Sequence, residues 1–259
     1  MEWYFVLLIV VAIIIALYLL LEFICGKKSA MSVIDSKCYD YDQSNEFQLR
    51  VEGINPKEIM SHWKTDEFSL QVDNAVLFGY FIDADVKISD KTVIISHGIN
   101  GNLIQSVKFA QLFREIGYNV VLYDHRHFGK SSGKYCTLGY QESTDLSKLI
   151  DFTLEHYSNT RVLGLHGESM GAATVLLTLS KKDNIDFVVS DCGFSDAEKL
   201  IKRVISKSVH MPAYPSASIA RMFTKSYCGY DVYKVKPIES VKKSDTPILF
   251  IHGDADDFI

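Results

Sequence analysis

The chain has 259 residues, 47% of them apolar, which is enough to bury one sizeable core. Its net charge of −5 provides no basic surface for a phosphate backbone, so nucleic acid is excluded as an expected partner. Five cysteines without a C-x-x-C pair are typical of reduced thiols, and we expect neither a metal nor another cofactor.

The N-terminal segment is an apolar run without a charge from Trp3 to Leu21. As a helix it would cover roughly 28 Å at about 1.5 Å per residue, close to the hydrocarbon core of a bilayer. We therefore expect a membrane anchor over residues 1–28. A cleaved signal peptide is the competing interpretation, but the run lacks a basic n-region and an A-x-A-like site. Three lysines follow the run and none precedes it: Lys27, Lys28 and Lys37. This asymmetry favours a cytoplasmic globular domain.

Residues 29–65 are mixed and polar, and we expect them to be a tether and entry segment. A globular domain should then occupy residues 66–259. Its first elements are two runs, at 68–72 and 76–82, in which apolar and polar residues alternate. They flank a short turn, as the strands of a β-hairpin do.

Buried-strand runs alternate with helical patterns from residue 92 onward. Strands are predicted at 92–96, 119–124, 161–166, 186–191 and 247–253, with helices at 102–117, 140–157 and 169–181. This order predicts an α/β fold with a mostly parallel sheet that helices cover on both faces. A helical insertion at about 194–240 would form a lid. Active sites of such sheets lie at the carboxyl ends of the strands.

The strand end at residues 167–171 reads Gly-Glu-Ser-Met-Gly and matches G-x-S-x-G between a strand and a helix. A sharp turn would hold Ser169 in strained backbone geometry, and side chains at Gly167 and Gly171 would collide with neighbouring backbone. Ser169 is therefore the candidate nucleophile. A turn without chemistry is the competing interpretation.

A nucleophilic serine needs donors for the negative charge that develops on the carbonyl oxygen. The backbone N–H of Met170, at the start of the following helix, is one candidate. The strand end at 96 offers the second, because His97 and Gly98 there precede the N–H of Ile99. The competing interpretation of this loop is a glycine-containing turn without a ligand.

Together these motifs resemble the α/β-hydrolase superfamily, in particular the membrane-anchored bacterial group described as serine aminopeptidase-like or Bem46-like. Further matching segments are Asn100, YDHRHFGKSSG (123–133), SDCGFSD (190–196) and PILFIHGDADD (247–257). The resemblance implies the α/β-hydrolase fold. It also implies a structural role for Asp124 and Arg126, which would brace the loop around Gly129 and Ser131.

Two other interpretations of segment 123–133 are weaker. A phosphate-binding loop would need a glycine where the chain has Asp124. His125 and His127 alternate as a metal-binding pair does, but no third ligand has suitable spacing.

The resemblance implies that the acid of a Ser-acid-His triad follows the last strand. The family spacing selects Asp256, three residues after Gly253, with Asp254 as the runner-up. In this fold the histidine comes after the acid, yet none of the eight histidines follows Asp256. We therefore expect the given chain to be truncated before its last strand, its last helix and the catalytic histidine.

The sequence thus predicts a membrane-anchored serine hydrolase that cleaves an ester, thioester or amide of a small molecule or peptide through an acyl-enzyme on Ser169. Large apolar residues of the insertion would roof the pocket and select an apolar acyl group, although lid packing explains them equally well: Phe194, Met211, Tyr214, Met222, Phe223 and Tyr227. The alternative is a non-catalytic α/β-hydrolase-like domain that binds a ligand or partner at the membrane. The sequence does not determine the oligomeric state.

Overall fold

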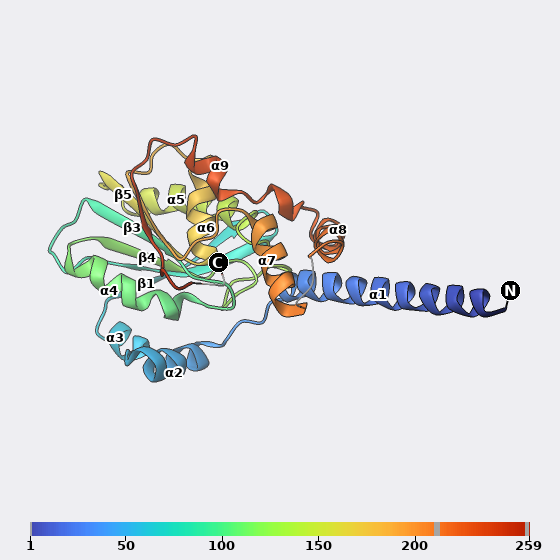
Figure 1. The fold of residues 1–259 in the computed structure, drawn as a ribbon. Coiled ribbons are helices and arrows are strands. Elements are labelled where there is room, and N and C mark those ends of the chain that lie inside the picture. The colour runs from blue at the N-terminus through green and yellow to red at the C-terminus, as the bar shows by residue number, and fades with distance from the viewer. Residues whose placement is uncertain (1, 210–212, 257–258) are drawn as a thin grey trace.

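The computed structural model describes residues 2–209, 213–256 and 259 (Figure 1). The helices are α1 (Glu2–Ile34), α2 (Tyr41–Glu52), α3 (Pro56–Ser61), α4 (Val107–Glu115), α5 (Glu142–His156), α6 (Met170–Thr178), α7 (Ala197–Val209), α8 (Ser216–Cys228) and α9 (Pro237–Val241), with 3₁₀ turns η1 (Leu103–Ser106) and η2 (Val232–Lys234). The strands are β1 (Thr65–Val72), β2 (Ala75–Ile82), β3 (Lys91–Ser96), β4 (Asn119–Tyr123), β5 (Val162–Glu168), β6 (Phe187–Asp191) and β7 (Ile248–Ile251).

The strands form one sheet in the order β1-β2-β4-β3-β5-β6-β7. The hairpin of β1 and β2 is antiparallel and joins β4 in antiparallel register, whereas β4, β3, β5, β6 and β7 run parallel. The central strands β3 and β4 are rich in valine and isoleucine and are almost wholly buried, as parallel strands covered on both faces are. The predicted α/β architecture is confirmed.

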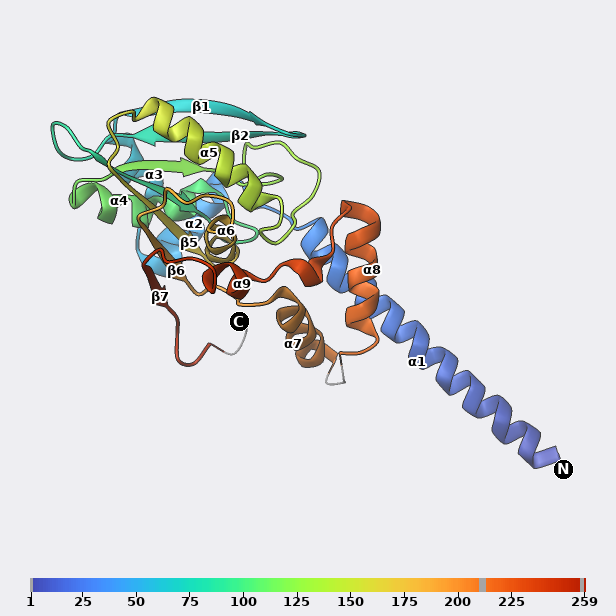
Figure 2. The ribbon, with the colours of Figure 1, turned by 90° about the horizontal axis from the view of Figure 1, so that it is seen from above.

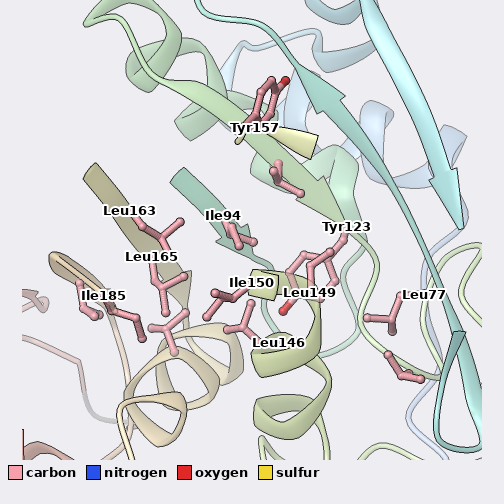
Figure 3. Packing of buried hydrophobic residues seen from close by; sticks show 14 of the residues in the cluster. Leu77, Ile94, Tyr123, Leu146, Leu149, Ile150, Tyr157, Leu163, Leu165 and Ile185 are labelled. Atoms are coloured by element: carbon pink, nitrogen blue, oxygen red, sulfur yellow. The ribbon is translucent and has the colours of Figure 1, made fainter. Parts of the chain in front are cut away.

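Helices cover both faces of the sheet. On one face, Leu146, Leu149 and Ile150 of α5 pack against strand residues such as Ile94, and Figure 3 shows this cluster from close by. α6 lies beside α5 on the same face. On the opposite face, Val107 of α4 joins a second cluster, outside which α2 and α3 lie. The sheet is thus held between two apolar layers.

Helix α1 projects from the domain as one continuous helix (Figure 1). Its large apolar side chains from Trp3 to Leu21 are 38–65% exposed, and its length and composition are sufficient to cross a membrane. The helix continues beyond residue 28, the predicted end of the anchor, to Ile34. Ala30 and Ile34 are buried against Ala220 of α8, so tertiary packing extends the helix past the lysines.

The rest of the segment expected to be a tether is also folded. Asp40 and Gln43 form a capping box at the start of α2, and Gly53 ends that helix with φ 70°. Asn55 caps α3 by accepting from the N–H of Glu58. Residues 35–64 therefore contribute two capped helices to the domain surface.

Helix α8 of the insertion packs along the C-terminal part of α1 (Figure 2). The buried carboxylate of Glu22 accepts from the backbone N–H of Ser216 at 3.1 Å and from its hydroxyl. A Cβ on Gly26 would lie 2.5 Å from the carbonyl oxygen of Ser216, so only glycine allows this approach. The anchor helix and the insertion therefore form one packed unit.

Candidate active site

Ser169 lies at the sharp turn between β5 and α6. Its backbone has φ 56° and ψ −115°, a conformation that residues with a Cβ rarely adopt. Hydrogen bonds fix the turn on both sides: the Ser169 N–H donates to the carbonyl oxygen of Asp191 at 2.8 Å, and its own carbonyl accepts from Ala173 at 3.1 Å. The strain expected at this position is present in the structure.

The two glycines of the motif are required by close backbone contacts. A Cβ on Gly167 would lie 2.3 Å from the carbonyl carbon of Gly171. A Cβ on Gly171 would lie 2.0 Å from the carbonyl oxygen of Ser96, at the end of β3. The expected collisions are therefore confirmed, and they explain how α6 begins directly beneath the turn.

The two predicted oxyanion donors line the same cavity as Ser169. Met170 is the first residue of α6, where a backbone N–H has no acceptor within the helix. Ile99 follows Gly98, whose added Cβ would stand 3.5 Å from the Ser169 Cβ, and Ile99 lines the same cavity as Ser169. Asn100 then reverses the chain with φ 64°.

The imidazole of His97 holds this loop in place and is fully buried. Its Nδ1 lies 2.7 Å from the carbonyl oxygen of Gly98, and its Nε2 accepts from the backbone N–H of His125 at 2.9 Å. Nδ1 therefore carries the proton and donates. Burial lowers the pKa of His97 to about 4, so the ring stays neutral near pH 7. His97 is a positioning residue of the loop that carries Ile99.

The loop after β4 has the structural role implied by the resemblance. The carboxylate of Asp124 accepts from the backbone N–H of Lys130 at 2.7 Å and of Leu103 at 2.8 Å, and from the Tyr41 hydroxyl at 2.5 Å. Arg126 and Asp145 form a buried pair with two hydrogen bonds of 2.6 Å. These contacts anchor the loop and add nothing to a reactive centre.

A cavity of about 210 Å³ opens above Ser169. Ser169, Met170, Ile99 and Asn100 form one side of it, and Leu138 and Phe194 lie beside them. The remaining lining residues come from α1, α7 and the C-terminal segment: Ser29, Ser32, Val33, Leu200, Ile201, Val204 and Ile259. The lining is mostly apolar and suits an acyl group better than a charged one.

Of the five described residues among the six predicted to roof the pocket, only Phe194 lines it. Phe223 packs against Phe23 of α1, with ring centroids 5.7 Å apart. The others that the structure describes are exposed: Tyr214 at 71%, Met222 at 52% and Tyr227 at 47%. Met211 lies outside the described residues. The roof comes from α7, because α8 is occupied by its contact with α1.

Asp256 lies close to the cavity in the segment after β7. Its Oδ1 accepts from the backbone N–H of Ile259 at 3.0 Å, and Ile259 itself lines the cavity. Its Oδ2 is 3.5 Å from Nε2 of His252. Asp254 is exposed, and Asp257 lies outside the described residues. These contacts favour Asp256 over Asp254 as the candidate acid. Among the described residues that line the cavity there is no histidine.

Sequence reasoning missed the three residues that α1 contributes to the cavity: Ser29, Ser32 and Val33. A signal was nevertheless present. Gly26 and Ala30 are small residues at i and i+4, a spacing that lets a second helix approach closely. The pattern indicates that the helix continues into a packed interface, and the side of α1 beside that interface faces Ser169.

Comparison with known proteins identifies relatives of the fold. An esterase of Pyrococcus furiosus has a similar structure, with a TM-score of 0.62 and 27% identity over 80% of this chain and 76% of that chain. The uncharacterized protein YqkD of Bacillus subtilis is 36% identical over 170 residues, which are 65% of this chain and 56% of its own length. The chain thus spans little more than half the length of that relative.

A third relative bears on the anchor. An uncharacterized membrane protein of Saccharomyces cerevisiae is 25% identical over 173 residues, 66% of this chain and 56% of its own length. The family described as alpha/beta hydrolase fold matches residues 91–227, which include β3, the turn at Ser169, α7 and all of α8 except its last residue. The chain therefore belongs to the alpha/beta hydrolase fold family.

Proposed function

We propose that the full-length protein is a membrane-anchored serine hydrolase that cleaves an ester, thioester or amide through an acyl-enzyme on Ser169. The observation that carries this proposal is the left-handed backbone of Ser169 (φ 56°) beside an apolar cavity. Such a conformation costs about 1–3 kcal/mol in a residue with a Cβ. A turn with no chemical task would be more stable with glycine at this position.

The neighbouring amides support acyl transfer in particular. The Ser169 hydroxyl would attack the substrate carbonyl carbon, while the N–H groups of Met170 and Ile99 would donate to the carbonyl oxygen as it becomes negative. One such donor contributes about 3–4 kcal/mol to the transition state. Met170 adds the positive end of the α6 dipole at the same point.

The reaction also needs a group that accepts the Ser169 proton. The family order of Ser, acid and His assigns this role to a histidine that Asp256 orients. Asp256 is suited to the task because it lies next to Ile259 at the cavity. His97 is unsuited, because both of its ring nitrogens are engaged in holding the loop.

Labelling with a fluorophosphonate probe tests the proposal, because the probe reacts only with an activated serine. We expect the full-length protein in membranes to be labelled, the Ser169→Ala variant to be unlabelled, and the Ser180→Ala control, on the exposed end beyond α6, to be labelled normally. Labelling that persists in Ser169→Ala would exclude Ser169 as the nucleophile. An unlabelled wild-type protein would favour the non-catalytic binding domain.

A further inference from the structure

Part of the cavity lining belongs to the same helix that carries the apolar span. Ser29, Ser32 and Val33 of α1 line the cavity together with Leu200, Ile201 and Val204 of α7. Figure 2 shows that α1 leaves the domain directly beside α7 and α8. The acyl pocket is therefore continuous with the membrane anchor.

The distance between the span and the cavity is short. Exposed apolar side chains continue along α1 as far as Ile24, which is 51% exposed. Ser29 follows five residues later, or about 7.5 Å along the helix axis at 1.5 Å per residue. The head-group layer on each side of a bilayer is roughly 5–8 Å thick. The cavity thus begins at the surface of the membrane, once the apolar part of α1 is immersed.

The contact between α1 and the helical insertion supports the same placement of the cavity near the membrane surface. Glu22, the only charged residue on α1 between Trp3 and Gly26, is buried against Ser216 and so is withdrawn from lipid. This contact places the first turn of α8 at the end of the apolar span. Tyr214, two residues before Ser216, exposes its side chain there. Exposed tyrosines at that depth are typical of a membrane interface.

We propose that the substrate is an acyl ester of a membrane lipid, drawn from the leaflet at which the domain lies, with its acyl chain held between α1 and α7. This inference rests on the proposed serine hydrolase function. Ser169 Oγ would bond to the ester carbonyl carbon, the bond to the lipid alcohol would break, and the serine proton would leave with that alcohol. Water would then cleave the acyl-serine ester, releasing a fatty acid and restoring the hydroxyl.

A comparison of two substrates tests the role of α1. The full-length protein in phosphatidylcholine vesicles is given a water-soluble acetyl ester or a long-chain fluorogenic ester embedded in the bilayer. We expect Ser29→Trp, which fills the α1 side of the cavity, to lower the ratio of long-chain to acetyl ester hydrolysis about tenfold or more. The control Ile24→Trp, on the lipid-exposed part of the same helix, should leave the ratio unchanged. An unchanged ratio in Ser29→Trp would overturn the proposal.

Photocrosslinking separates this inference from the catalytic proposal, because it requires no turnover. Wild-type protein in vesicles that contain a phosphatidylcholine with a diazirine-bearing acyl chain should crosslink at peptides carrying Ser29 to Val33 and Leu200 to Val204. Crosslinks confined to the span before Ile24 would overturn lipid entry into the cavity, even if Ser169 hydrolyses soluble esters. Crosslinks in the cavity without Ser169-dependent hydrolysis would leave the lipid site standing and refute the hydrolase.

Discussion

Gly171 lies directly against Ser96, so that a Cβ at position 171 would stand 2.0 Å from the carbonyl oxygen at the end of β3. This contact joins the first turn of α6 to the strand that leads to the loop carrying Ile99. Any side chain there must push the helix away from the sheet, and with it the N–H of Met170.

Replacement of Gly171 by alanine is therefore expected to destabilise the protein. Overpacking against backbone cannot be relieved by a rotamer change, and the cost should be about 3 kcal/mol, the upper end of the usual range for overpacking. Chemical denaturation in detergent micelles measures it. Gly98→Ala is the matched control, because its added Cβ meets only ordinary contacts of 3.5 Å. Equal unfolding free energies of the two variants would contradict the collision expected between a side chain at position 171 and Ser96.

The buried His97 should make folding sensitive to acid. Burial lowers its pKa from 6.5 to about 4, so the unfolded chain binds a proton that the folded protein excludes. The stability from His97 is complete above about pH 6.5 and falls by up to about 3 kcal/mol as the pH drops to 4. His97→Gln removes this titration. The difference in unfolding free energy between wild type and His97→Gln should therefore decrease as the pH is lowered.

Unfolding free energies of both proteins between pH 4 and 7 decide this point. The exposed residue His62 provides the control, since His62→Gln should leave the pH profile unchanged. A gap between wild type and His97→Gln that stays constant with pH would contradict the buried, neutral imidazole.

Asp124 should make the folded protein more stable in acid, the opposite of the effect expected from His97. Burial raises the pKa of its carboxyl group from 3.8 to about 6, although three donors stabilise the ionised form. The contribution of Asp124 to stability is therefore full below about pH 4 and decreases by up to about 3 kcal/mol as the pH rises past 6. Asp124→Asn lacks this titration, so it should be most destabilised relative to wild type in acid.

The same denaturation series over pH measures the effect of Asp124→Asn. The exposed residue Asp66 serves as control, and Asp66→Asn should show no comparable change. If Asp124→Asn instead lost most stability at neutral pH, the carboxylate would have to be ionised and strongly stabilised in the folded loop.

The contact between Glu22 and Ser216 should determine how firmly α8 is held. Glu22→Ala removes the acceptor at the start of α8 and should cost about 1–2 kcal/mol, as the loss of a helix cap does. Amide hydrogen exchange should then accelerate in the first turns of α8. Glu22→Gln retains an acceptor oxygen and should exchange more slowly than Glu22→Ala. Identical exchange in wild type and Glu22→Ala would show that Glu22 does not secure α8.

The sidedness expected from the three lysines can be tested by cysteine labelling. Ile88 is 79% exposed in the loop between β2 and β3. A membrane-impermeant maleimide should label Ile88→Cys only after the cells are permeabilised, if the domain is cytoplasmic. A cysteine in place of Glu2 should react in intact cells, and the parent protein gives the background of its five native cysteines. Labelling of Ile88→Cys in intact cells would reverse the orientation.

Much of the fold was predictable because its signals are local. The turn at Ser169 is specified by five consecutive residues, in which the glycines at 167 and 171 permit backbone contacts that any side chain would block. The buried strands are continuous valine and isoleucine runs, which few other elements produce. The α/β order and the strained turn at Ser169 follow from these two patterns alone.

The walls of the cavity were not predictable in the same way, since they depend on tertiary contacts. Ser29 and Ser32 are small polar residues after two lysines, a composition that suggests a loop. Their helix persists because Ala30 and Ile34 are buried against α8. Tyr214 and Met222 resemble pocket residues in sequence, but the docking of α8 on α1 turns them outward.

The uninterrupted course of α1 has a mechanical consequence. The helix has 33 residues and is about 50 Å long, and no flexible joint separates its apolar part from the turns that pack on α8. Thicker and thinner bilayers change the tilt of a spanning helix. If α1 spans the bilayer as we propose, every change in its tilt must therefore rotate the whole globular domain and alter the angle at which the cavity meets the lipid head groups.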